Sequence, residues 1–96
     1  MTNPENIQSF TNEFDPDGDI QRDGQEYILI DQRQRLHEQQ RQWGISAVDR
    51  ASLQAELVLV YHQLTQIDEA RASKYLPSLH AMQRTLQRQR DKLNEQ

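Results

Sequence analysis

Apolar residues in the middle of the chain repeat with the spacing of an amphipathic helix. Their separations alternate between four and three residues, as along one face of a helix that packs against another. Ser46 and Asp49 have the spacing of a capping box at the start of such a helix, and Val58 and Leu59 widen its apolar stripe. The sequence therefore predicts a central helix over about 46–72. Its packing residues are Leu53, Leu57, Val60, Tyr61, Leu64 and Ile67.

A second helix is predicted over about 77–94. Pro77 suits the first turn of a helix, where its missing N–H leaves no hydrogen bond unmade. Leu79, Met82 and Leu86 continue the heptad spacing of the central helix. Since the link between the two segments, "ASKYLP", is short, we expect the two helices to form an antiparallel hairpin.

A third helix is predicted over about 26–43, upstream of the hairpin. Leu29, Leu36 and Trp43 recur every seven residues, and Gly44 is suited to stop a helix. Alternatively, "YILI" is a strand that an Asp-Gly turn joins to "DIQR", which would make 19–30 a β-hairpin. The helix is favoured because the Leu36 and Trp43 repeat needs it.

Length and composition indicate one small all-α domain with a thin core. The 96 residues are 34% hydrophobic, below the roughly 45–50% of globular domains. We therefore expect a second copy or a target protein to complete the bundle. Residues 26–96 form the predicted helical domain, and residues 1–25 an acidic N-terminal arm that is flexible. Trp43 is either an interface anchor or a cover for the hairpin core.

Charge is distributed along the chain as a gradient. Residues 1–31 carry eight acidic side chains and one basic one, whereas residues 71–96 carry six basic and two acidic ones. An acidic head and a basic tail attract one another within a chain or between copies. This pattern predicts a homo-oligomer with head-to-tail or antiparallel association.

One acidic segment has the spacing of a cation site. Residues 15–26 read "DPDGDIQRDGQE", and their oxygen-bearing side chains match the ligand positions of the twelve-residue calcium loop. These side chains are Asp15, Asp17, Asp19, Gln21, Asp23 and Glu26. The segment resembles an EF-hand loop, and residues 3–14, with Ile7, Phe10 and Phe14 on one face, resemble its incoming helix. The resemblance implies a calcium-responsive binder.

Two positions depart from the EF-hand pattern. Ile20 stands where the loop normally has Gly with positive φ, and Arg22 stands where an apolar residue pairs with a second loop. The alternative interpretation is an acidic linker whose carboxylates repel one another. Without calcium at this loop, no cofactor is expected.

Other chemistry has little support in the sequence. Cysteine is absent, His37, His62 and His80 do not have metal-ligand spacing, and no nucleophile or phosphate-binding motif occurs. We therefore expect no enzyme and no catalytic residues. The longest apolar run, "LVLVY", is too short to cross a membrane, and the N-terminus lacks the features of a signal peptide, so a soluble cytoplasmic protein is expected.

Nucleic-acid binding is a further alternative, carried by the basic C-terminal helix. Its candidate residues are Arg84, Arg88, Arg90 and Lys92. Cations near a helix C-terminus also complement the helix dipole, and the chain as a whole is acidic, with a net charge of −4. The favoured function is a small protein–protein interaction module, such as an adaptor, a chaperone-like partner or an inhibitor, that binds through helix packing.

Overall fold

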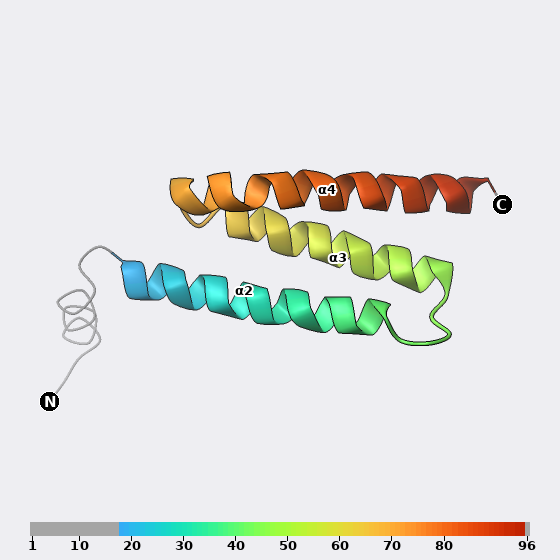
Figure 1. Ribbon diagram of the computed structural model, residues 1–96, viewed down its shortest axis with the longest axis horizontal. Helices are drawn as coiled ribbons and strands as arrows, with labels where there is room; N and C mark the ends of the chain where they lie inside the picture. Colours follow the sequence, from blue (N-terminus) through green and yellow to red (C-terminus); the bar gives the residue numbers. More distant parts are fainter. Residues whose placement is uncertain (1–17, 96) are drawn as a thin grey trace, which may run out of the picture.

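Three α-helices make up the described part of the chain, residues 18–95 of this computed structural model. Helix α2 spans Asp19–Gln40, α3 spans Ala47–Thr65 and α4 spans Glu69–Asn94. Helix α3 lies between the other two, and each neighbouring pair is antiparallel (Figure 1). The predicted all-α class, the helical hairpin and the central position of the middle helix are confirmed.

The start of α3 follows the capping signal in the sequence. The Asp49 N–H donates a hydrogen bond of 3.0 Å to the Ser46 hydroxyl oxygen, which satisfies one of the free N–H groups of the first turn. In the preceding loop, Gly44 has a φ of 82°, a conformation that side chains with a Cβ rarely adopt. The predicted cap and the predicted glycine stop therefore both lie in the connection from α2 to α3.

The turn of the α3–α4 hairpin lies earlier than predicted. Helix α3 ends at Thr65, and α4 begins at Glu69 after Asp68, whose carboxylate accepts a 2.8 Å hydrogen bond from the Arg71 N–H. The predicted link around "ASKYLP" is wrong, because Pro77 lies inside α4. An interior proline costs roughly 3 kcal/mol of helix stability. Burial of Tyr75 and Leu79 on either side of Pro77 offsets that cost.

Helix α2 starts seven residues before the predicted boundary and ends at Gln40. The segment 19–30 is helical, so the β-hairpin alternative is wrong. The Asp-Gly pair at 23–24 is helical, and Leu29 and Ile30, in the next turns of α2, pack against the core and favour that conformation over a hairpin. The acidic segment 19–25 therefore belongs to the helical domain.

The core lies along α3, with α2 on one side and α4 on the other. Leu57 and Leu64 are fully buried and Val60 is 2% exposed. The remaining members of the buried cluster come from all three helices: Leu36, Tyr61, Tyr75 and Leu79. The rings of Tyr61 and Tyr75 lie 6.4 Å apart, centroid to centroid, and join α3 to α4.

A buried glutamine links the three helices. Gln54 of α3 is 3% exposed, and its side-chain oxygen accepts a 3.0 Å hydrogen bond from the Gln40 amide of α2. Its own amide donates a 3.0 Å hydrogen bond to the Met82 carbonyl of α4. Because a buried amide without partners would destabilise the fold, this bridge fixes how α2 and α4 sit on α3.

Candidate interaction surfaces

The predicted packing residues divide between the core and its margins. Leu57, Val60, Tyr61, Leu64, Leu79 and Leu86 are buried, and Leu53, Ile67 and Met82 pack against the core while partly buried. Trp43 lies in the loop after α2 and is fully exposed. The prediction that Trp43 covers the hairpin core is wrong, because α2 ends at Gln40 and Trp43 is not a member of the buried cluster.

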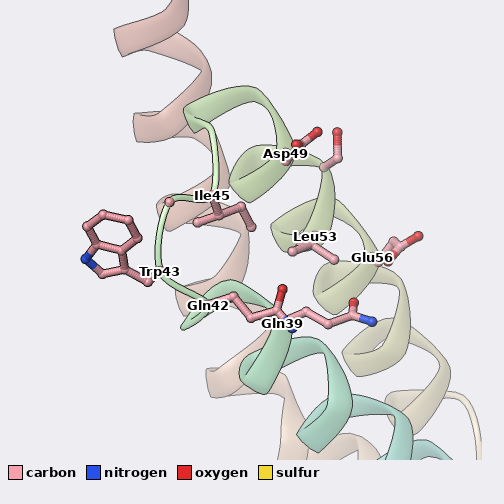
Figure 2. A pocket seen from close by; sticks show the side chains of 9 residues that line it. Gln39, Gln42, Trp43, Ile45, Asp49, Leu53 and Glu56 are labelled. Carbon is pink, nitrogen blue, oxygen red and sulfur yellow. The ribbon is translucent and has the colours of Figure 1, made fainter.

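A hollow of about 530 Å³ lies beside the α2–α3 loop. Gln39 and Gln42 form one side of it, and Leu53 and Glu56 of α3 form the other, with Ile45 of the loop between them (Figure 2). The Trp43 indole points away from these side chains toward solvent (Figure 2). The exposed Trp43 indole is therefore available to contact another molecule beside the hollow.

A second hollow, of about 410 Å³, lies at the opposite end of the same pair of helices. Its floor is apolar and consists of Ile28, Leu29 and Ile67, and its rim consists of Gln25, Gln63 and Gln66. Glu56 of the first hollow and Gln63 of the second are seven residues apart in α3, and Gln25 and Gln39 are fourteen residues apart in α2, so the two hollows lie along the same side of this helix pair. We call this side, with both hollows, the α2–α3 groove.

The α2–α3 groove presents apolar side chains that the chain itself leaves uncovered. Ile28 is 66% exposed and Trp43 is 101% exposed, and Leu59 on the adjacent flank of α3 is 61% exposed. Single exposed apolar residues are common on protein surfaces. Several of them along one groove, rimmed by glutamines and by the carboxylates of Asp49 and Glu56, instead indicate a surface that binds another protein.

Charged residues gather where α2 and α4 begin. The Arg71 guanidinium of α4 forms ion pairs with Asp23, with Glu26 at 3.1 Å, and with Asp68. The Tyr75 hydroxyl donates a hydrogen bond to the Glu26 carboxylate. Since Asp23 and Glu26 belong to α2, this Arg71 cluster ties the start of α2 to the start of α4 across the end of α3.

The Arg71 cluster changes the acidity of its members. The hydrogen bond from Tyr75 and the nearby Arg71 guanidinium lower the pKa of Glu26, against the opposing effect of burial. The hydrogen bond from the Arg71 backbone lowers the pKa of Asp68. Burial disfavours the charged form of Arg71, but Glu26, Asp68 and Asp23 together raise its pKa. These shifts favour the ionised states of Glu26, Asp68 and Arg71, which keeps the ion pairs between α2 and α4 charged.

The candidate calcium ligands do not surround a common point in the described residues. Asp19, Asp23 and Glu26 all lie in α2, where Asp23 and Glu26 contact Arg71. Among residues 18–95, no three His, Asp or Glu side chains form a group that could hold a metal ion. Asp15 and Asp17, like the incoming helix of the EF-hand resemblance, lie outside the described residues, so the calcium site stays a prediction.

The candidate nucleic-acid residues all lie in the second half of α4. Arg88 and Lys92 border a hollow of about 200 Å³ with Thr85 and Gln89. Arg84 borders another hollow, of about 520 Å³, with Pro77 and His80 among its lining residues. Arg84, Arg88 and Lys92 recur every four residues and lie along one side of α4, whereas Arg90 lies on another side, and nucleic-acid binding stays a prediction.

A row of cations that the sequence analysis missed lies on α2. Arg33, His37 and Arg41 recur every four residues, and none forms an ion pair with a carboxylate within residues 18–95. Partial burial, together with the charges of Arg33 and Arg41, lowers the pKa of His37. The Arg33 guanidinium carbon lies 5.9 Å from the centre of the Tyr61 ring, and the guanidinium donates a hydrogen bond to the Tyr61 hydroxyl. We call these three residues the α2 cation row.

No protein-family model matches the chain, and neither a curated protein nor a solved structure matches it. The function is therefore inferred from the surfaces themselves. None of the three helices in residues 18–95 combines the length and the hydropathy that a membrane span requires.

Proposed function

We propose that this protein is a small, non-enzymatic, cytoplasmic interaction module that binds an amphipathic helix of another protein in the α2–α3 groove. The observation that carries the proposal is the exposure of Trp43 and Ile28 beside two hollows on one side of the same helix pair. Exposed aromatic residues next to hollows are the usual anchors of protein interfaces.

The groove specifies the chemistry of the bound helix. The hollows are separated by about 21 Å, the rise of fourteen helical residues. A helix with apolar side chains repeated every seven residues would reach both hollows with two side chains fourteen residues apart. The glutamines of the rim can donate and accept hydrogen bonds with polar flanks of the helix, and Asp49 and Glu56 beside the first hollow disfavour acidic side chains there.

The proposal can be tested with a synthetic helical peptide. We would use an eighteen-residue peptide with leucines seven residues apart and glutamines on its flanks, and a scrambled peptide of the same composition. Trp43 is the chain's single tryptophan, so its fluorescence reports directly on the groove. Binding should shift its emission to shorter wavelength and move the amide signals of Ile28, Leu53 and Ile67.

Two isoleucines of α2 provide a matched pair of variants. Ile28 is 66% exposed and lines the groove, whereas Ile20 is 67% exposed and lies outside both hollows. Ile28→Asp should weaken peptide binding at least tenfold, and Ile20→Asp should leave it unchanged. Equal effects of the two variants, or equal binding of the scrambled peptide, would overturn the proposal.

A further inference from the structure

Opposite charges occupy the two halves of one face of α2. Asp19, Asp23 and Glu26 lie in the first half, and the α2 cation row lies in the second. With Ile30 between them, these residues follow one another at spacings of three and four, so they share one side of the helix. We call this side the α2 charged face.

The α2 charged face is nearly symmetric about Ile30. Asp19 lies eleven residues before Ile30 and Arg41 lies eleven after it, while Asp23 and His37 are each seven residues away. A helix with this arrangement is complementary to a second copy of itself that runs in the opposite direction. Each acidic residue would then face a basic residue of the other copy.

The face is open to such a partner. The side chains of Asp19 and Asp23 are 74% and 71% exposed, and Tyr27 is 74% exposed. A hollow of about 530 Å³ lies over the centre of the face, lined by Ile30 and Tyr27 of α2 and by Lys74 and Tyr75 of α4.

The acidic half of the α2 charged face forms ion pairs within residues 18–95, whereas the basic half does not. Asp19 pairs with Arg22, and Asp23 pairs with Arg71, but both carboxylates remain largely exposed and can accept further hydrogen bonds. Arg33 and Arg41 have no carboxylate partner among the described residues. Arg33 and Arg41 are therefore the charged residues of the α2 charged face that lack a counter-charge among the described residues.

From this arrangement we infer that a second copy of this chain binds through the α2 charged face, with the two α2 helices antiparallel around Ile30. Asp19 faces the partner's Arg41, and Asp23 faces the partner's His37. Tyr27 of each copy enters the hollow of the other beside Ile30. The contact uses the side of α2 that is turned away from the α2–α3 groove, so it does not depend on the proposed helix binding.

The decisive test is a charge exchange. In one chain Asp19 and Arg41 are about 33 Å apart along α2, too far to interact. We expect Asp19→Arg and Arg41→Asp each to raise the dimer dissociation constant at least tenfold in sedimentation equilibrium at low salt. The doubly exchanged chain should return to within about threefold of the unaltered chain, because the exchanged charges again meet across the antiparallel contact.

Arg35→Asp serves as the matched control, because Arg35 pairs with Asp31 on another side of α2. It should leave the dissociation constant unchanged. A monomer at all concentrations up to millimolar, single variants without effect, or a double variant that is no better than the singles would each overturn the inference. Peptide binding in the α2–α3 groove would survive any of these results, so the two proposals fail separately.

Discussion

Helices α2 and α4 both pack on α3, but different forces hold them there. Helix α4 buries Tyr75, Leu79 and Leu86, whereas α2 buries Leu36 alone. Polar contacts compensate for the smaller apolar burial of α2, with the Arg71 cluster at one end of the helix and the Gln40–Gln54 hydrogen bond at the other. Because apolar burial stabilises more strongly than ion pairs near the surface, we expect α2 to detach first.

This difference has a functional consequence. Both proposed surfaces involve α2, which contributes one wall of the α2–α3 groove and the whole α2 charged face. The α3–α4 hairpin acts as the stable support. A less firmly held helix that carries the binding residues can adjust its position when a partner binds.

The largest effect is expected from the centre of the α3–α4 core. Leu57 is fully buried, so Leu57→Ala should lower the free energy of unfolding by about 4 kcal/mol, from lost burial and the cavity left behind. Leu59→Ala, two residues away at a position that is 61% exposed, should change it by less than about 0.5 kcal/mol. Urea unfolding followed by circular dichroism measures both. Similar losses in the two variants would contradict this view of the core.

The next effect separates α2 from the hairpin. Leu36→Ala truncates the one buried side chain of α2 and should lower the free energy of unfolding by about 2–3 kcal/mol. Amide hydrogen exchange should then become fast across Asp19–Gln40 while α3 and α4 stay protected. Uniformly faster exchange in all three helices would show that α2 and the hairpin unfold as a single unit, which would contradict the view that α2 is held less firmly than α4.

The sequence predicted the hairpin core better than the attachment of α2. Heptad spacing predicted Leu57, Val60, Leu64, Leu79 and Leu86 as packing residues, and all five are buried, but it missed Tyr75, which lies in the segment predicted as the link. The predicted position of the turn is wrong because proline by itself favours the first turn of a helix, whereas tertiary packing carries α4 through Pro77. Asp68, which caps α4, was the signal that could have located the turn.

The candidate surfaces depend on facts that spacing alone does not contain. Arg71 meets Asp23 and Glu26 because the turn at 66–68 brings the start of α4 beside the start of α2. The hollows depend on how deeply α2 sits against α3. The repeat of Arg33, His37 and Arg41 was visible in the sequence, but it became meaningful only once 19–40 was a single helix.

A smaller effect is expected at the polar bridge between the three helices. Gln54→Ala removes both the hydrogen bond from the Gln40 amide and the one to the Met82 carbonyl, so the free energy of unfolding should fall by about 1–3 kcal/mol. Gln63→Ala, at an exposed position of the same helix, should change it by less than about 0.5 kcal/mol. If α2 docks through Leu36 alone, the two substitutions will have equal effects in urea unfolding.

The smallest effect concerns pH, and it tests the other polar end of α2. The pKa of Glu26 is lowered below its ordinary value of 4.5, chiefly by the Tyr75 hydrogen bond and by Arg71. A carboxyl whose pKa is lower in the folded state stabilises the fold above the unfolded pKa and stops doing so as the pH falls through the folded pKa. The urea midpoint of the unaltered chain should therefore fall as the pH is lowered from 6 to 3.

Glu26→Gln should weaken that pH dependence of the urea midpoint. Asp68 should supply part of the dependence that remains, because its pKa is lowered too. Glu56→Gln, which removes an exposed carboxylate from α3, should keep the full dependence. Equal pH profiles for the two variants would mean that the Arg71 cluster does not hold α2, and that Leu36 and Gln54 alone fix its position.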